Sequence, residues 1–330
     1  MSVLVTGGAG YIGAHVVRLL QERGEEVIVV DDLSTGSASR IGDAELVEVD
    51  LATDEAYRIL TDTMIDKDVD AVIHFAAKKQ VGESVQRPAT YYHQNVGGLA
   101  NLLRAMYDAG VKEMIFSSSA AVYGLPDVDM VPEDVEKHPI NPYGETKLIG
   151  EWMMRDCGVA WGLKSVALRY FNAAGTGWTD LEDPAALNLV PIILNRLHAG
   201  KTPVVFGDDY DTADGTCVRD YIHVMDLANA HLLALDALRN GNAKHGAYNV
   251  GTGTGSSVFE VVDGIREISG WDFPIEVSAR REGDPGYLVA DSSRIKEDMG
   301  FQAQFGLADI LQSAWDANQL GSKKVQVPTK

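Results

Sequence analysis

Hydrophobic residues in the first half of the chain follow two alternating patterns. Short, mostly β-branched runs predict buried strands at 2–6, 26–31, 44–50, 70–76, 113–118 and 165–170. Between them, amphipathic stretches predict helices at 12–23, 53–65, 89–109 and 142–156. Because strands and helices alternate, we expect an α/β fold built on a doubly wound parallel sheet with right-handed crossovers.

The alternation weakens after about residue 175. Glycine, proline and aspartate cluster at 175–184 and 207–216, and the later elements are less regular. We expect a first domain over 1–175 and a smaller C-terminal α/β domain over 176–330 that closes over it. Part of 219–252 could pack back on the first domain.

Composition narrows the class of protein. The 330 residues carry a formal charge of −20, which argues against binding nucleic acid or an anionic membrane. Cys157 and Cys217 are far apart and lack metal-ligand spacing, so we expect reduced thiols and no metal site. The N-terminal apolar run is short and broken by glycines, so we expect neither a signal peptide nor a membrane span. These features favour a cytoplasmic protein.

A glycine-rich turn, GGAGYIG, follows the first predicted strand and opens the first predicted helix. It satisfies G-x-G-x-x-G at Gly8, Gly10 and Gly13, and a longer pattern from Gly7. Glycines at these positions allow a tight turn and let backbone N–H groups approach a pyrophosphate at a helix N-terminus. In this context the motif predicts a Rossmann-type, dinucleotide-binding sheet.

The second predicted strand ends at Asp31, followed by Asp32. A carboxylate there accepts from the adenosine ribose hydroxyls and would repel a 2′-phosphate, which favours NAD over NADP. Asp50, after the third strand, could reach the adenine, although a surface turn residue would look the same. Phe75 follows the fourth strand and could equally be core packing.

Tyr143 lies four positions before Lys147 in NPYGETK, so a helix would place both on one face. A cation beside a phenol stabilises phenolate and lowers its pKa, which suits a general base. The four-residue spacing alone also fits a Tyr143–Lys147 pair that serves only solubility and packing. Here, however, the run SSSAAVYG ends a strand of the same sheet and offers Ser119. We therefore predict a catalytic Ser119–Tyr143–Lys147 set.

Seven segments carry a wider resemblance: VLVTGGAGYIG, VIHFAAKKQVGESV, FSSSAAVYG, NPYGETK, RYFNAAG, DGTCVRDYIHVMDLA and RREGD. With them the chain resembles the extended short-chain dehydrogenase/reductase family and, within it, the UDP-glucose (UDP-galactose) 4-epimerases. The resemblance implies an isomerase of galactose metabolism that interconverts UDP-galactose and UDP-glucose. It implies transient oxidation at sugar C4 to a 4-keto intermediate, tightly bound NAD, Tyr143 as base, and a homodimer.

The resemblance also assigns binding residues by position. For NAD these are Gly7, Gly10, Tyr11, Ile12, Gly13, Asp31, Asp32, Ser34, Thr35, Gly36, Asp50, Leu51, Phe75, Ala76, Ala77, Lys79, Asn95, Ser117, Ser118, Tyr143, Lys147, Tyr170 and Phe171. For the UDP-sugar they are Ser119, Tyr143, Asn172, Asn188, Leu189, Phe206, Arg219, Tyr221, Arg281, Asp284 and Leu288. Two arginines can clamp a pyrophosphate, and an aspartate can accept from ribose hydroxyls.

Some assignments stay open at this point. Arg280 could replace Arg281 as the clamp, and either Gln94 or Asn95 could bond the cofactor. Leu288 stands where relatives carry tyrosine or cysteine, which bears on the size of the sugar accepted.

Three other functions compete with the epimerase. A 4,6-dehydratase needs an acid/base pair where this chain has Ala120 and Ala121. Another nucleotide-sugar epimerase or decarboxylase would want a cation near sugar C6, and no residue identifies one. A non-catalytic NAD-sensing module would be expected to lose the Ser–Tyr–Lys set.

Overall fold

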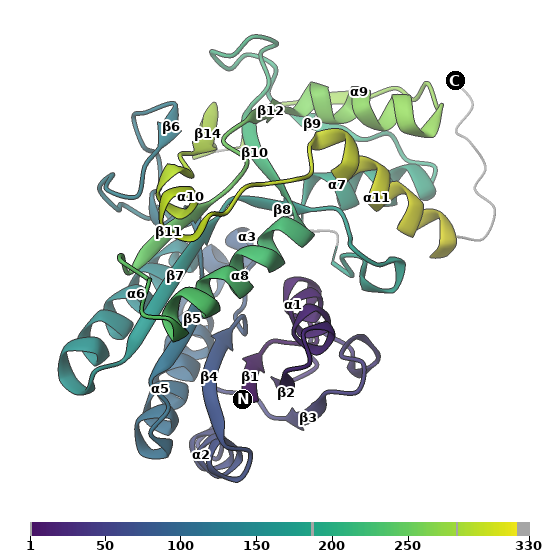
Figure 1. Cartoon of the computed structure of the whole chain (residues 1–330). Helices are drawn as coiled ribbons and strands as arrows, with labels where there is room; N and C mark the ends of the chain where they lie inside the picture. The colour runs from purple at the N-terminus through teal and green to yellow at the C-terminus, as the bar shows by residue number, and fades with distance from the viewer. Residues whose placement is uncertain (1, 186–187, 282, 322–330) are drawn as a thin grey trace.

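A seven-stranded parallel sheet forms the centre of the protein (Figure 1). The computed structural model describes residues 2–185, 188–281 and 283–321. In spatial order the strands are β11 (Ala247–Val250), β7 (Lys164–Tyr170), β5 (Glu113–Ser119), β4 (Val69–His74), β1 (Ser2–Thr6), β2 (Glu26–Asp31) and β3 (Glu45–Glu48). Every neighbouring pair is parallel, which confirms the predicted Rossmann-type α/β fold.

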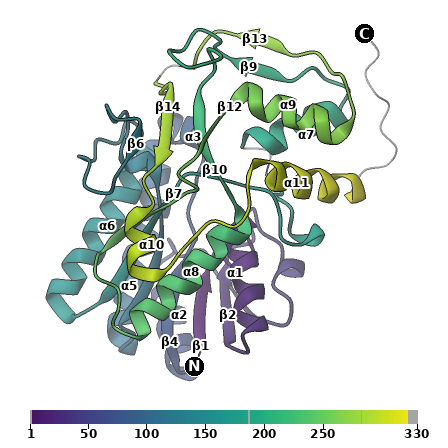
Figure 2. The same ribbon diagram turned by 45° about the horizontal axis from the view of Figure 1, so that its top comes forward.

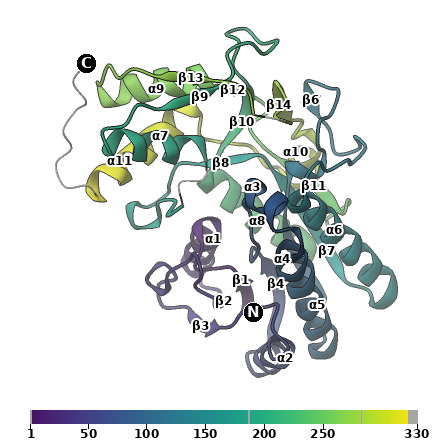
Figure 3. The same cartoon turned by 180° about the vertical axis from the view of Figure 1, so that it is seen from behind.

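Helices cover both faces of this sheet. On one face α1 (Tyr11–Glu22) and α8 (Val224–Arg239) share an apolar core with β1 and β7. On the other face lie α2 (Ala56–Asp66), α5 (Gly98–Ala109) and α6 (Pro142–Trp161). Figure 3 shows α5 and α6 side by side on this second face. Short elements connect them: α3 (Val81–Gln86), α4 (Pro88–Tyr91), a π-helix (Tyr92–Gly97), and 3₁₀ turns at Ala38–Arg40, Ala120–Val122 and Thr179–Leu181.

Three predicted elements differ from the structure. The helix predicted over 89–109 is divided into α4 and α5 by the π-helix at Tyr92–Gly97. The run at 44–50 was expected to be a buried strand, but β3 is shorter and half-exposed because only β2 pairs with it. The helix predicted over 142–156 continues through Gly158 to Trp161 and ends only at Gly162. Gly162 ends the helix with a φ of +80°, a conformation that glycine adopts without strain.

The second half of the chain builds a smaller layer beyond the carboxyl ends of the large sheet (Figure 2). Its strands are β6 (Met130–Val131), β8 (Asn172–Ala174), β9 (Val204–Phe206), β10 (Val218–His223), β12 (Gly255–Ser257), β13 (Glu276–Ser278) and β14 (Tyr287–Ala290). Its helices are α7 (Leu189–His198), α9 (Val258–Ser269), α10 (Ser293–Met299) and α11 (Leu307–Gly321).

Residues 224–250 return from this layer to the large sheet, because α8 packs on its face and β11 pairs with β7. The domain boundary at residue 175 stays a prediction. Across the described residues, none of the helices combines the length and apolarity that a membrane crossing requires.

Candidate active site

The sheet topology gathers most predicted cofactor residues along one edge. In a parallel sheet all strands point the same way, so the loops that follow β1, β2, β4, β5 and β7 meet at their carboxyl ends. The predicted residues at these ends fall into five groups, 7–13, 31–36, 75–79, 117–119 and 170–171. The order in which the strands pair therefore brings distant parts of the sequence to a single crevice.

The glycine-rich turn is shaped for close approach by another group. A Cβ at Gly7, which has a φ of +69°, would lie 2.6 Å from Ala76 N, and one at Gly13 would lie 2.2 Å from Gly7 O. Gly10 caps α1 without any side-chain hydrogen bond, so the first N–H groups of this helix keep no side-chain partner at the cap. A pyrophosphate is the ligand that such a bare helix start favours, so these residues fit a dinucleotide.

Asp31 also holds this turn together, a role that the sequence did not indicate. Its carboxylate accepts from Ala9 N at 3.0 Å and from Leu33 N at 2.9 Å. Burial is the main cause that raises the pKa of Asp31. The loop that follows lies against the turn, because a Cβ at Gly36 would sit 2.8 Å from Ala9 O. Each Asp31 oxygen keeps a lone pair with which to accept from a ribose.

The amides of Gln94 and Asn95 have different partners. Gln94 donates to Asp50 at 3.1 Å. Asn95 is buried, accepts from Lys78 N at 2.8 Å and donates to Lys78 O and Thr146 Oγ1, both at 3.0 Å. Asn95 thus ties the loop that contains Lys79 to α6. Through these hydrogen bonds it shapes the cofactor edge indirectly.

Tyr143, Lys147 and Ser119 come together as predicted from their spacing. Tyr143 lies in the first turn of α6, whose N-terminus is capped by the side chain of Asn141. Ser119 ends β5, where its hydroxyl accepts from Ala121 N at 3.2 Å, and it lies close enough to Tyr143 to lower the pKa of the phenol. One turn along α6, the Lys147 ammonium lies 5.9 Å from the centroid of the Tyr143 ring and donates to Ser117 O at 2.8 Å. Both α6 side chains are buried.

The expected lowering of the Tyr143 pKa by Lys147 is wrong. Burial raises the pKa of the phenol, against a smaller lowering by the hydrogen bond with Ser119. Burial also lowers the pKa of Lys147 to about 8. The same apolar surroundings disfavour both charges, and Lys147 donates to Ser117 rather than to the phenol.

A buried polar network behind the serines was missed by the sequence analysis. Glu151, one turn beyond Lys147 on α6, accepts from Arg169 at 2.9 and 2.6 Å and from Ser118 Oγ at 2.6 Å. Arg169 also donates to Tyr123 OH at 3.0 Å. The network ties α6 to β5 and β7. The local sequence around Glu151 and Arg169 does not indicate this network, because the partners of each residue come from other elements.

The residues predicted to hold the pyrophosphate and ribose also cluster. Arg219 forms an ion pair with Asp284 at 2.5 Å, and the Arg281 guanidinium lies 4.2 Å from the centroid of the Phe206 ring. Arg280 instead pairs with Asp209 at 2.6 Å. The structure therefore directs Arg281, and not Arg280, toward another predicted contact residue.

The segment that follows β8 is held against the cofactor edge. Tyr11 OH donates to Gly175 O at 2.5 Å, and Arg40 donates to Glu182 O at 2.9 Å. Asn188, at the start of α7, donates to Ala173 O at 3.3 Å and so lies beside β8, which carries Asn172. These contacts bring the predicted sugar-nucleotide residues of this segment next to the glycine-rich turn.

The remaining predicted residues are placed as follows. Tyr221 is buried in β10 opposite Asn172, and Leu288 in β14 lies opposite Arg219. Lys79 is exposed, and its charge acts on Asp183. None of these positions conflicts with the predicted roles.

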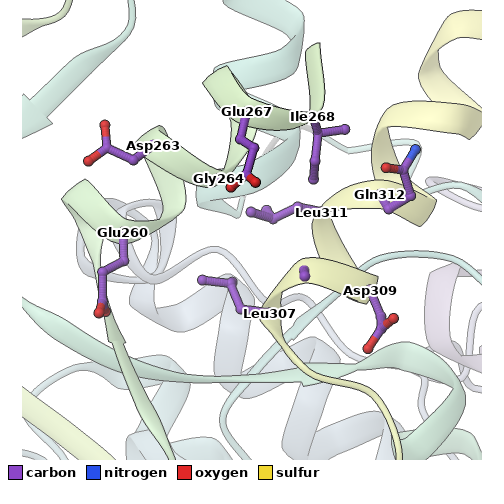
Figure 4. Close-up of a pocket in the computed structure, with 10 residues that line it drawn as sticks. Glu260, Asp263, Gly264, Glu267, Ile268, Leu307, Asp309, Leu311 and Gln312 are labelled. Atoms are coloured by element: carbon purple, nitrogen blue, oxygen red, sulfur yellow. The ribbon is translucent and has the colours of Figure 1, made fainter. Parts of the chain in front are cut away.

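A cavity of about 840 Å³ lies elsewhere, between α9 and α11. Figure 4 shows the carboxylates of Glu260, Asp263, Glu267 and Asp309 around it, with Leu307 and Leu311 between them. None of its lining residues belongs to the predicted site, so we assign it no part in the chemistry.

Comparisons with known proteins agree with this geometry. Residues 3–251 match the NAD dependent epimerase/dehydratase family. The chain is 44% identical over 322 residues to a UDP-glucose 4-epimerase of Halalkalibacterium halodurans, covering 96% of this chain and 95% of the relative.

Solved structures are similar over nearly the whole chain. A UDP-glucose 4-epimerase of Brucella ovis in complex with NAD has a TM-score of 0.90 and 43% identity, covering 99% of both chains. One of Bifidobacterium longum in complex with NAD⁺ and UDP has a TM-score of 0.89 and 36% identity, covering 97% of this chain and 99% of the other. On the family match, the relatives and these structures, the chain belongs to the NAD-dependent epimerase/dehydratase family and, within it, to the UDP-glucose 4-epimerases.

Proposed function

We propose that this protein is an NAD-dependent isomerase that interconverts UDP-galactose and UDP-glucose, with Tyr143 as the base. The observation that carries the proposal is the cluster of Ser119, Tyr143 and Lys147 at the carboxyl end of a sheet whose first turn fits a dinucleotide, with the Lys147 ammonium 5.9 Å from the centroid of the Tyr143 ring. Relatives solved with NAD and with UDP support both ligands.

In this mechanism Tyr143 takes the proton of the sugar 4-hydroxyl, which Ser119 orients by its own hydrogen bond. The chemistry that NAD supplies when bound is reversible acceptance of the C4 hydride, together with the positive charge of its oxidised ring. Lys147 adds a second positive charge, held in place by Ser117 O at 2.8 Å. The 4-keto sugar then rotates in the site and takes the hydride back at C4 on its opposite face, while Tyr143 returns the proton to its oxygen, so no net oxidation occurs.

The experiment that tests this function is incubation of purified protein with UDP-galactose without added NAD. Appearance of UDP-glucose, with NAD released only on denaturation, is the expected result. No conversion, with or without added NAD, would contradict the proposal and favour an NAD-sensing module. A 4-keto-6-deoxy product would indicate a dehydratase instead, for which Ala120 and Ala121 supply no acid.

Replacing Arg219 or Arg281 by alanine should weaken UDP binding about 10- to 100-fold and change the rate of the chemical step much less. The reason is loss of a charge-assisted contact, about 1.5–3 kcal/mol. Titration calorimetry with UDP measures the affinity. Arg280→Ala is the matched control, since Arg280 pairs with Asp209, and its affinity should stay within about twofold. Unchanged UDP affinity in Arg219→Ala would mean that Arg219 serves only a structural ion pair with Asp284.

Leu288 should limit the size of the sugar. It packs against the cluster that contains Phe171 and Val122, and it lies opposite Arg219 in β14. A branched side chain there leaves less room for an N-acetyl group at C2 than a cysteine would. Leu288→Cys should therefore raise the ratio of kcat/KM for UDP-N-acetylglucosamine over UDP-glucose. Equal specificity constants for both sugars in the unmodified protein would mean that the leucine excludes nothing.

We also propose a homodimer built on α5 and α6. Tyr107 on α5 and Trp152 and Val159 on α6 are large apolar residues that are 60%, 48% and 87% exposed. A second copy that covers this face would remove them from water. Sedimentation should show a dimer, and Trp152→Glu with Val159→Glu should shift it to monomer. A dimer that survives both changes would place the interface elsewhere.

We also propose a cytoplasmic location, because Cys157 and Cys217 are both free, as is usual in a reducing compartment.

A further inference from the structure

A buried ion pair lies behind the turn that contains Ser119. Glu151 on α6 and Arg169 on β7 pair at 2.6 Å, and their side chains are only 10% and 5% exposed. Both Nε and Nη2 of Arg169 donate to the carboxylate, so the contact is bidentate. The mechanism above gives this pair no part, although Glu151 is one turn along α6 from Lys147. The other hydrogen bonds of the pair reach the two ends of the turn.

One end of the turn is held through Ser118, which directly precedes Ser119 and is fully buried. The serine before it, Ser117, faces α8, where its Oγ lies 3.0 Å from Nε2 of His231. Ser118 faces α6 instead, and its hydroxyl donates to Glu151 at 2.6 Å. The hydroxyl hydrogen of Ser118 is thereby used inside the protein, so toward a cofactor this side chain can only accept.

The other end of the turn is held through Tyr123. Arg169 donates to Tyr123 OH at 3.0 Å, and this hydroxyl donates in turn to Asn249 Oδ1 at 2.7 Å. Tyr123 is 1% exposed, and its N–H donates to Ala120 O at 3.0 Å, which closes the 3₁₀ turn at Ala120–Val122. A single ion pair therefore holds the residues on both sides of this turn.

The turn itself lies against the start of the helix that contains Tyr143. Ser119 caps the turn by accepting from Ala121 N at 3.2 Å. A Cβ at Gly144, the residue after Tyr143, would lie only 2.5 Å from Ala121 O. The turn and the first turn of α6 are therefore in close backbone contact, and a shift of the turn changes the distance between Ser119 and Tyr143.

We propose that Glu151 and Arg169 are positioning residues: by holding both ends of the turn, they set where the Ser119 hydroxyl lies relative to the proposed base. The inference rests on the proposed epimerase function and deepens it. A misplacement of about 1 Å in an oriented site lowers the rate by up to about 100-fold. Replacing a buried ion pair by apolar side chains of similar volume is often neutral or stabilising, so the effects on rate and on stability can be separated.

Two double variants of the NAD-loaded enzyme test the inference. The first, Glu151→Leu with Arg169→Met, leaves Ser118 without an acceptor, so kcat should fall about 10- to 100-fold while KM for UDP-galactose and NAD content stay within about twofold. Its Tm should stay within about 5 °C of the unmodified value or rise. The second, Glu151→Gln with Arg169→Met, keeps an amide oxygen for Ser118 and should be at least about fivefold faster than the first. It should nevertheless be less stable than the first, because its buried amide N–H groups lack a partner.

Adding Ser118→Ala to each double variant shows whether the acceptor acts through Ser118. In the second double variant it should slow kcat to the level of the first, and in the first it should change kcat by less than about twofold. Glu25→Leu with Arg239→Met is the matched control. The side chains of this ion pair are also buried, with 10% and 13% exposure, but Glu25 precedes β2, at the amino ends of the strands. The control should leave kcat unchanged.

Three outcomes would overturn the inference: equal rates in the two double variants, a kcat that follows Tm across all variants, or loss of bound NAD in the first double variant. The last would mean that the ion pair acts on the cofactor and not on Ser119. If the first double variant does not fold, Ser118→Ala and Tyr123→Phe in the otherwise unmodified enzyme decide. Each removes one hydroxyl and should lower kcat at least about fivefold, and a normal kcat in both refutes the role.

Failure of this inference is distinguishable from failure of the proposed function. An unmodified enzyme that does not convert UDP-galactose refutes the function itself, whereas an active enzyme whose first double variant keeps a normal kcat refutes only the positioning role.

Discussion

Replacing Tyr143 by phenylalanine should lower kcat by about 10³-fold and leave UDP and NAD binding nearly unchanged. The change removes one oxygen from a buried ring, so the packing of α6 is preserved while the proposed base is lost. General bases contribute about 10²–10⁴-fold to rate. Ser119 would keep its place at the end of β5. Initial rates with UDP-galactose, together with calorimetry of UDP binding, measure the two effects.

Tyr248→Phe is the matched control for this experiment. Tyr248, on the outer strand β11, is also fully buried. Its hydroxyl accepts from Lys244 N and His245 N and donates to Asp298 on α10. Its loss should lower stability by about 1–2 kcal/mol without changing kcat. Turnover in Tyr143→Phe within about tenfold of the unmodified rate would move the base to another group, such as Ser119 acting through water.

Replacing Lys147 by methionine should slow the enzyme and stabilise the fold at the same time. The Lys147 ammonium is buried, with one hydrogen bond to Ser117 O and, among the described residues, no carboxylate in an ion pair with it. The Lys147 ammonium lies 5.9 Å from the centroid of the Tyr143 ring, so its loss removes one of the two positive charges that the proposed mechanism places near the base. Turnover should therefore fall by about 10- to 100-fold. Methionine fills a similar volume without a charge to desolvate, which should raise the free energy of unfolding by about 1–3 kcal/mol.

The stabilisation should depend on pH in a defined direction. Burial lowers the pKa of Lys147 from 10.5 in the unfolded chain to about 8 in the folded one. Below pH 8 Lys147 is charged in both the folded and the unfolded state, so the folded enzyme bears the full free-energy cost of burying the ammonium. Between pH 8 and 10.5 the folded state releases its proton first, and the unmodified enzyme gains stability. The advantage of Lys147→Met should therefore be largest at pH 7 and vanish near pH 10.5.

Chemical denaturation of the NAD-free proteins at pH 7 and pH 10 measures this difference. Lys112→Met, on an exposed lysine, should change stability by less than about 0.5 kcal/mol at either pH. A Lys147→Met variant that is less stable at pH 7 would show that the ammonium is already compensated inside the protein.

Local patterns predicted the large sheet and the reacting residues well, because both have local signatures. The strands β1 and β2 begin and end as the hydrophobic runs indicated, and Tyr143 and Lys147 share a helix face because four residues make about one turn. The direction in which the Tyr143 pKa shifts could not be predicted, since it depends on burial by residues from several elements. The His231–Ser117 and Glu151–Arg169 contacts were also invisible, because each joins buried polar groups that are far apart in sequence.

The pairing of β11 with β7 has a consequence for how the chain is made. Ala247 pairs with Ala167, 80 positions earlier, so during synthesis β7 leaves the ribosome long before its outer neighbour exists. Until residues 224–250 arrive, the nascent sheet ends in a bare strand edge and lacks α8, one of the two helices that cover one of its faces. Such a sheet is open to pairing with other chains. A protein fragment that stops near residue 175 would be left permanently in that condition and should depend on chaperones to stay unaggregated.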